Sequence, residues 1–160
     1  MQFKISVAKK KDSLEILDLS NDFEVRNNSF NSNKITSSEH IKWFEEKIKN
    51  KKSIFYVVRD EKDIFMGYVR FDEEDDNSCF ITIHLKEEFR GKGIGTELIK
   101  KTTEKVLSKS HYSKVYSYIK KDNIASLKAF LKSNYVEISD KEIINGFSCF
   151  KLVREKINEK

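Results

Sequence analysis

The chain has 160 residues, a formal net charge of +5 and 38% hydrophobic residues. This length suits one domain, spanning residues 1–160, and no run of about 18 apolar residues predicts a membrane-spanning helix. Cys79 and Cys149 lack CxxC or metal-ligand spacing, and the N-terminus lacks the apolar core of a secretory signal. We therefore expect a cytoplasmic protein with no metal and no membrane partner.

The first half of the chain predicts one strand, two helices and then three strands. Alternating apolar residues indicate the strands, and capping residues before apolar residues at helical spacing indicate the helices. In chain order we expect a strand at 3–7, a helix after Asp12 and Ser13, a polar loop at 27–33, a helix at 36–48 capped by Ser37 or Ser38, and strands at 54–58, 64–71 and 79–85. Residues 72–77 are expected to form a turn.

The second half alternates helices and strands. We expect a helix at 95–109, a strand near Val115, a helix at 124–131, and strands near Tyr135 and Phe147. The predicted order is β-α-α-β-β-β-α-β-α-β-β. This order predicts an α/β (α+β) fold with a mixed central sheet.

Three of the five glycines lie between the strand at 79–85 and the following helix. Such a turn exposes backbone N–H groups at the positive end of a helix, and glycine lets a polyphosphate approach them closely. The sequence therefore predicts a pyrophosphate-binding turn, made by Arg90, Gly91, Lys92, Gly93, Ile94, Gly95 and Thr96.

This turn does not have the spacing of a P-loop or of a dinucleotide-binding loop. It fits the pattern Arg/Gln-x-x-Gly-x-Gly/Ala, and it resembles the acetyl-CoA-binding motif of the GNAT family of N-acetyltransferases. Residues 123–130, which follow the strand near Val115, are similar to a second family segment. The resemblance implies a GNAT fold with splayed parallel strands, helices on both faces of the sheet and acetyl-CoA as acetyl donor.

The same resemblance assigns further donor-site residues. It implies that Asn123 lies beside the pantetheine arm and that the arm pairs with the backbone near Ile83 and Leu85. It also assigns Phe130 to the coenzyme site, at a position where the family often has a tyrosine that acts as general acid. Because phenylalanine cannot donate a proton, the acid must lie elsewhere.

The N-terminal half is similar to GNAT enzymes that act on nucleotide-linked amino sugars, as in pseudaminic-acid-type pathways. The similarity lies in residues 29–35, 39–44 and 68–72. It implies that the acceptor is a nucleotide sugar that contacts Phe30, Asn31, His40, Trp43 and Arg70. His40 is alternatively a structural residue bonded to a loop carbonyl. Trp43 lies off the predicted Ile41–Phe44–Ile48 face, and either stacks on a ligand or belongs to the core.

No Cys–His or Ser–His signature suggests a covalent intermediate, so we expect the acceptor amine to attack the acetyl group directly. His84 and His40 are the candidate bases. Tyr118 is the candidate acid, with Tyr116 as its alternative, and a backbone N–H near Leu85 is expected to stabilise the developing oxyanion.

Other functions remain open from the sequence. The acceptor could instead be a protein N-terminus, a polyamine or an antibiotic, or the chain could be a non-catalytic acyl-CoA-binding regulator. We expect no nucleic-acid partner, because acidic residues are interspersed with the basic clusters. The prediction leaves room for a homodimer.

Overall fold

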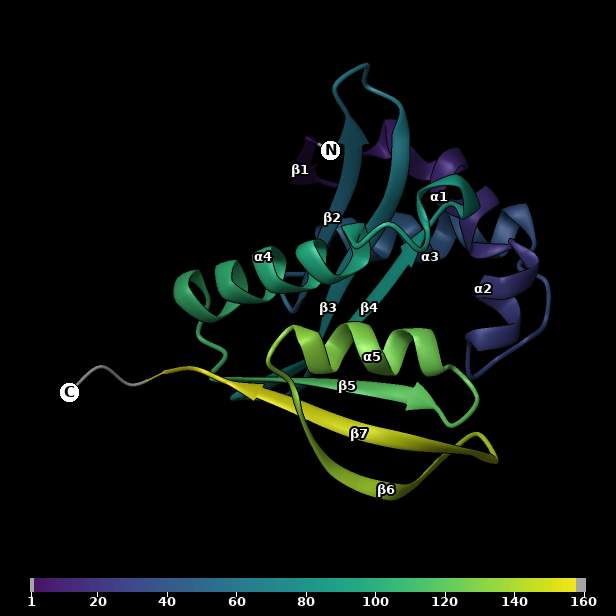
Figure 1. Ribbon diagram of the computed structural model, residues 1–160. Helices are drawn as coiled ribbons and strands as arrows, with labels where there is room; N and C mark the ends of the chain where they lie inside the picture. Colours follow the sequence, from purple (N-terminus) through teal and green to yellow (C-terminus); the bar gives the residue numbers. More distant parts are fainter. Residues whose placement is uncertain (1, 158–160) are drawn as a thin grey trace. The chain divides into compact units, whose positions relative to one another are not determined.

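The computed structural model describes residues 2–157 (Figure 1). Its helices and strands are, in chain order, β1 (Phe3–Val7), α1 (Ser13–Ser20), α2 (Phe23–Asn28), α3 (Ser37–Lys49), β2 (Ser53–Asp60), β3 (Phe65–Asp75), β4 (Ser78–Leu85), α4 (Ile94–Lys109), β5 (Lys114–Lys120), α5 (Ile124–Lys132), β6 (Val136–Ile144) and β7 (Phe147–Glu155). The strands form a seven-stranded sheet in the order β1-β2-β3-β4-β5-β7-β6, in which β4 pairs with β5 in parallel and β5 with β7 antiparallel. The expected mixed α/β class is confirmed.

The chain divides into two compact units. The first comprises residues up to Asp72 together with Thr82–Arg90, and the second comprises Glu73–Ile81 together with the chain from Gly91 onward. Strands β3 and β4 each contribute residues to both units. A single domain over 1–160 therefore stays a prediction, and residues 1 and 158–160 of that domain lie outside the described residues.

The core of the first unit forms where α1 and α3 pack against strand β2. Ile16, Phe44, Phe55 and Val57 are buried in this cluster, and Trp43 and Ile48 are partly buried against it. The predicted buried face of α3 was wrong at Ile41, which is 49% exposed. His40 takes its place in the core, because α3 turns its 40–44 side toward α1.

Two local predictions in this unit were also wrong. Helix α2 covers part of the expected 27–33 loop, and Asp22 caps it by accepting hydrogen bonds from the N–H groups of Glu24 and Val25. The side chain of Thr36, not of Ser37 or Ser38, caps α3 by accepting from the N–H of Glu39. Thr36 thus lies one residue before the first predicted cap, and Asp22 lies before the segment that was predicted as a loop.

In the second unit, α4 and α5 accompany the strands β5, β7 and β6, and Figure 1 shows α5 running alongside β5. Leu98, Ile99 and Val106 of α4 are buried, as are Val115 of β5 and Leu152 of β7. Strand β3 continues to Asp75, so the turn expected at 72–77 is shorter than predicted.

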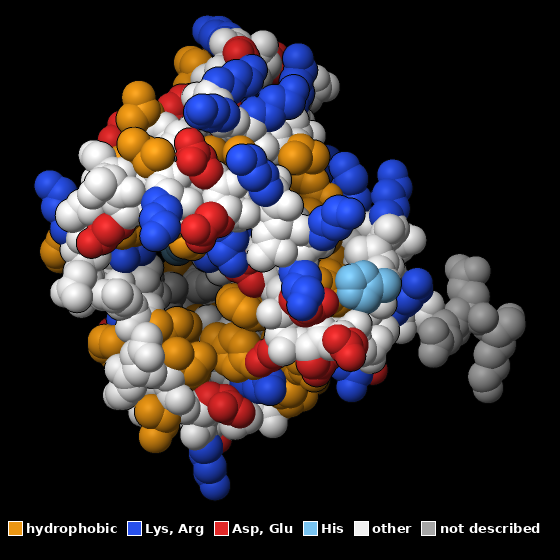
Figure 2. Space-filling model, turned by 180° about the vertical axis from the view of Figure 1, so that it is seen from behind, with side chains coloured by type: hydrophobic (Ala, Val, Ile, Leu, Met, Phe, Trp, Pro, Cys, Tyr) orange, Lys and Arg blue, Asp and Glu red, His pale blue; other side chains and the backbone are white. Residues whose placement is uncertain are grey.

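The surface carries both signs of charge. On the face shown in Figure 2, Lys and Arg side chains are interspersed with Asp and Glu side chains. Such mixing is typical of a solvated surface.

Candidate active site

The turn before α4 has the backbone that the glycines predict. Gly91 and Gly93 have φ values of +72° and +80°, in the left-handed region that other residues seldom adopt. Gly93 is the N-cap residue directly before α4, and a Cβ added at Gly91 or Gly93 would meet nothing within 4 Å. The space above this turn is therefore open for a ligand to approach the backbone.

The amide groups of this turn are available as donors. Among the described residues, none of the N–H groups of residues 91–96 donates a hydrogen bond, and the first bond of the helix runs from Glu97 N–H to the carbonyl of Gly93, at 3.2 Å. These donors lie at the positive end of α4, which extends to Lys109. The turn can therefore bind an anion through its backbone alone.

Arg90 precedes the turn, but its guanidinium is engaged within the first unit. Its Nε donates to the carbonyl of Leu85 at 2.9 Å, and its other nitrogens lie 2.8 Å from Glu24 and 3.0 Å from Asp22. Those carboxylates balance the charge of Arg90. The arginine thus fastens the start of α2 to the end of β4, a role that the sequence motif does not reveal.

His84 lies on β4, between the two predicted arm-binding residues Ile83 and Leu85. Its ring meets the edge of Tyr68 at 5.4 Å between centroids. Burial, together with the charges of Arg70, Arg26 and Arg90, lowers the pKa of His84 to about 3. The imidazole is therefore neutral near pH 7, and it is too weak a base to hold a proton taken from an ammonium group.

His40 is a core residue of the first unit. Its ring is 2% exposed, it stacks on Phe44 with 5.6 Å between centroids, and its Nε2 lies 2.9 Å from the carbonyl oxygen of Ser13. Burial lowers the pKa of this imidazole. These contacts agree with the alternative interpretation of His40 as a structural residue that bonds a backbone carbonyl.

Trp43 and Arg70, both in the first unit, are in contact with each other. The guanidinium of Arg70 lies 4.9 Å from the centre of the Trp43 ring, and its Nε donates to Asp72 at 2.7 Å. Asp72 also accepts from Lys47 at 2.7 Å, and these basic partners hold the pKa of its carboxyl below the usual range. Arg70 is therefore held in place by a stacking contact and an ion pair.

The loop that contains Phe30 and Asn31 is organised by Arg26, a residue that the sequence analysis missed. One nitrogen of Arg26 donates to the carbonyl of Asn31 at 2.9 Å, and Nε donates to the carbonyl of Ser20 at 2.6 Å. The only sequence signal was an arginine inside a stretch without acidic residues, from Val25 to Ser38.

In the second unit, Asn123 directly precedes α5 and Phe130 lies on that helix. The side chain of Asn123 caps this helix by accepting from the N–H of Ser126 at 3.3 Å, while its amide NH₂ donates to no described residue. Phe130 is 2% exposed and meets Tyr135 edge-on at 5.0 Å between ring centroids. Phe130 thus supports the helix from the core, whereas Asn123 keeps a donor for a ligand.

Tyr118 lies on β5, also in the second unit, on the same face as Tyr116. Its hydroxyl donates a hydrogen bond to Glu74, and its ring meets Phe80 with 6.2 Å between centroids. Burial and the adjacent carboxylate raise the pKa of Tyr118 well above its usual value. The phenol therefore holds its proton more tightly than a free tyrosine.

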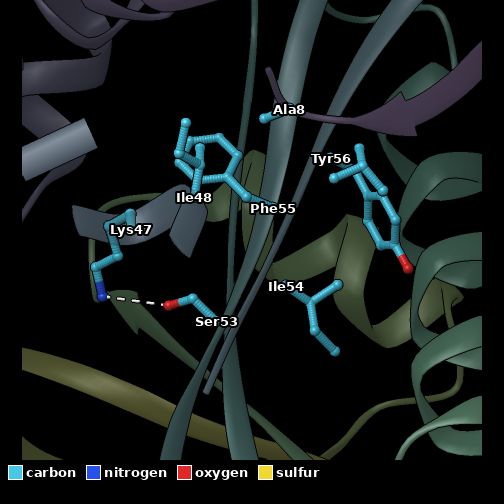
Figure 3. Close-up of a pocket in the computed structure, with 8 residues that line it drawn as sticks. Ala8, Lys47, Ile48, Ser53, Ile54, Phe55 and Tyr56 are labelled. Carbon is cyan, nitrogen blue, oxygen red and sulfur yellow. Dashed lines mark hydrogen bonds between the residues drawn. The ribbon is translucent and has the colours of Figure 1, made fainter. Parts of the chain in front are cut away.

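Other parts of the first unit offer less to a ligand. The pocket shown in Figure 3 lies beside β2, with the side chains of Ile48 and Phe55 together and Tyr56 on the other side of the strand. Lys47 at its rim is bonded to Ser53 and Asp72. Over residues 2–157, no group of His, Cys, Asp and Glu side chains suits a metal ion, and no helix is long and apolar enough to cross a membrane.

Comparison with known proteins decides the family. A family model described as an acetyltransferase (GNAT) domain matches residues 5–136. This chain is a GNAT acetyltransferase. No curated protein matches the sequence.

Solved structures share the fold of this GNAT acetyltransferase. A spermidine N-acetyltransferase from Vibrio cholerae, in complex with CoA and spermine, has a TM-score of 0.87 and 18% identity, and the match covers 97% of this chain and 96% of that one. A putative phosphinothricin N-acetyltransferase has a TM-score of 0.79 and 18% identity, over 98% of this chain and 100% of that one. A dodecameric form of the Vibrio cholerae enzyme gives a TM-score of 0.79 and 18% identity, over 97% and 94% of the two chains. At these identities the likeness shows the fold, not the acceptor.

Proposed function

We propose that this GNAT acetyltransferase transfers the acetyl group of acetyl-CoA to the amino group of a nucleotide-activated amino sugar. The observation that carries the acceptor class is the charge around His84. Besides burial, Arg70, Arg26 and Arg90 lower the pKa of this imidazole and Asp22 opposes them, and of the three arginines Arg26 has no carboxylate partner among the described residues. A positive environment attracts a phosphorylated acceptor and disfavours a polycation such as spermidine.

The proposed donor site uses the backbone more than side chains. The free N–H groups of residues 91–96 suit the diphosphate of the coenzyme, and the charge of Lys92 adds to them. The pairing of β4 with β5 runs from Ser78 to Phe80, and the backbone of Ile83 and Leu85, beyond that pairing, is the proposed partner of the pantetheine arm. The free amide NH₂ of Asn123 is the proposed side-chain donor.

When bound, acetyl-CoA supplies an acetyl thioester that an amine can attack directly. The amine must first be neutral, because an ammonium group has no lone pair. With a pKa of about 3, His84 cannot retain the departing proton, so we assign it to accept a hydrogen bond from the amine. The proton itself passes to solvent, and a backbone N–H near Leu85 stabilises the developing oxyanion.

Two further groups keep proposed roles. Tyr118 is the proposed acid for the leaving thiolate, and the loss of Glu74 should lower its pKa and free its proton. His40 is the alternative base, acting through water. An unchanged pH profile in His40→Gln would exclude His40 from proton transfer.

The acceptor is tested by measuring thiol release from acetyl-CoA. The acceptors compared are a UDP-linked amino sugar, the same amino sugar without its nucleotide, and spermidine. We expect release with the UDP-linked sugar at a kcat/KM at least about tenfold above that for spermidine, a difference of about 1.4 kcal/mol. Faster release with spermidine would contradict the proposed acceptor, and no release with any amine would contradict catalysis.

A further inference from the structure

Arg26 differs from the other arginines of the first unit in what it contacts. Its Nε donates to the carbonyl of Ser20 at 2.6 Å, and Nη1 donates to the carbonyls of Asn31 at 2.9 Å and Asn33 at 3.3 Å. Its Nη2 donates to the hydroxyl of Ser29 at 3.3 Å. All of these acceptors are neutral oxygens.

The charge of Arg26 therefore has no carboxylate partner. Within residues 2–157 no Asp or Glu side chain lies within ion-pair distance of it, whereas Arg59, Arg70 and Arg90 each pair with at least one carboxylate. After Arg26, residues 27–38 contain no Asp or Glu and do contain Lys34, and the acids just before it, Asp22 and Glu24, pair with Arg90. This segment is a region of local positive charge.

Arg26 is also half-buried, so its cation has lost part of its hydration. A partly desolvated cation without a counter-ion is unfavourable, and an arriving anion would relieve that cost. A guanidinium has five N–H groups, and the four bonds above leave one N–H of Nη2 without an acceptor among the residues described. The side chain thus keeps both a charge and a donor for a ligand.

The neighbouring side chains suit the rest of a sugar phosphate. Between Arg26 and Lys34 the chain carries only short amides, hydroxyls and the ring of Phe30. Amides and hydroxyls bond sugar hydroxyls in either direction, as donor or acceptor. Arg26 holds this loop through the carbonyls of Asn31 and Asn33.

We propose that Arg26 is a specificity-determining residue that selects acceptors carrying a phosphate or diphosphate. It acts through its own uncompensated charge and through the shape that it gives to the loop at residues 29–33. This inference rests on the proposed function and names the residue that enforces its acceptor class. A neutral or cationic amine gains nothing from this charge.

The test compares Arg26→Gln, Arg26→Lys and Arg59→Gln with the wild type. Arg59 is the matched control, because it pairs with Asp12 and Glu15 and so contributes to the stability of the same unit without serving the loop. UDP is the binding probe, titrated by calorimetry at low and at moderate salt. The KM for acetyl-CoA and the turnover of the UDP-linked amino sugar are measured in parallel.

Arg26→Gln should weaken UDP binding by about tenfold or more, since it removes a partly buried charge, and should leave the KM for acetyl-CoA within about twofold. Arg26→Lys keeps the positive charge but loses the planar guanidinium with its several N–H donors. Its UDP affinity should therefore lie between those of the wild type and Arg26→Gln, and its salt dependence should resemble that of the wild type. Arg59→Gln should melt at a lower temperature and bind UDP normally.

Equal UDP affinity in the wild type and Arg26→Gln would overturn the inference, as would a wild type that does not bind UDP. The outcome for the proposed function is separate. Turnover of the UDP-linked sugar that Arg26→Gln does not impair would leave the function standing and remove the role of Arg26. UDP binding that depends on Arg26, without turnover of that sugar, would support the inference and contradict the proposed acceptor.

Discussion

At the scale of single residues, Gly93 lies at the centre of the proposed diphosphate site. In Gly93→Ala the left-handed φ of +80° costs a non-glycine residue about 1 kcal/mol. The new methyl group also stands in the open space above the free amides. We expect a stability loss of that size by urea denaturation and a rise of about tenfold in the KM for acetyl-CoA, equal to about 1.4 kcal/mol of binding.

Gly146 provides the control for this substitution. It has a φ of +81° in the turn between β6 and β7, and a Cβ there would also meet nothing within 4 Å. Gly146→Ala should therefore lose the same stability and keep a normal KM for acetyl-CoA. If both variants raise the KM equally, the effect of Gly93→Ala is general strain and not lost coenzyme contact.

His84 makes the stability of the fold depend on pH. Its pKa is about 3 in the folded protein and near 6.5 when exposed, so below pH 6.5 the unfolded chain takes up a proton that the folded chain does not. The stability associated with the neutral imidazole is complete above pH 6.5 and is lost as the pH falls toward 3. Between pH 6 and pH 5 the wild type should lose about 1 kcal/mol more than His84→Asn.

Urea denaturation at both pH values measures this difference. His40 also has a lowered pKa, but it is present in both proteins, so its contribution cancels. An identical pH dependence in the wild type and His84→Asn would show that the imidazole of His84 is hydrated and not depressed.

At the scale of secondary-structure elements, the approach of β3 to β4 depends on Gly67. A Cβ at this position would lie 2.2 Å from the carbonyl oxygen of His84 and 3.0 Å from the Cα of Leu85. These are backbone atoms, so relief requires a shift of β4. Gly67→Ala should destabilise the protein by about 1–3 kcal/mol, as overpacking does, and should raise the KM for acetyl-CoA by moving the proposed arm-binding backbone.

Stability is again measured by urea denaturation, and Gly146→Ala again separates the effects, because it adds a methyl group without a clash. A Gly67→Ala protein with normal stability would mean that β3 and β4 lie further apart than described. If Gly67→Ala lowers stability but leaves the KM for acetyl-CoA unchanged, Ile83 and Leu85 are not coenzyme contacts.

The elements that the sequence predicted well are those with local signals. The glycine turn before α4 needs only its own residues, and β2 shows as a continuous apolar run, whereas β4 and β5 show as alternating apolar residues. Helix α2 was missed because it is short and depends on Asp22 for its cap and on Arg90, which is distant in sequence, to hold it. The buried face of α3 was wrongly predicted at Ile41. Packing against α1 buries the neighbouring His40 instead, and the sequence of α3 alone does not reveal that contact.

The site divides in the same way. Glycine conformation and the Asn123 cap follow from residue type and position, so the sequence predicts them. The ion pairs of Arg90 and the carbonyl contacts of Arg26 join parts of the chain that only the fold brings together. The partial burial of His84 and the charges of the arginines that act on it, which together lower its pKa, are likewise properties of the packed unit.

At the scale of the whole molecule, we propose that the two compact units unfold together as one domain. Strands β3 and β4 continue from one unit into the other, so the loss of either unit would fray strands on which the other depends. Trp43, the single tryptophan, reports on the first unit, while far-UV circular dichroism reports on the helices and strands of both. We expect the two signals to give coincident urea transitions, with the same midpoint and slope.

A ligand that contacts only the second unit sharpens this prediction, and inorganic pyrophosphate is the probe, because the free amides of the proposed diphosphate site belong to that unit, whereas the proposed arm-binding residues Ile83 and Leu85 belong to the first. At 100 times its dissociation constant, a ligand that binds only the folded state adds about 2.7 kcal/mol of stability. If the units are coupled, this addition should shift the Trp43 transition as far as the circular dichroism transition. A shift in circular dichroism that leaves the Trp43 midpoint unchanged would mean that the units unfold independently and that the chain is not a single cooperative domain.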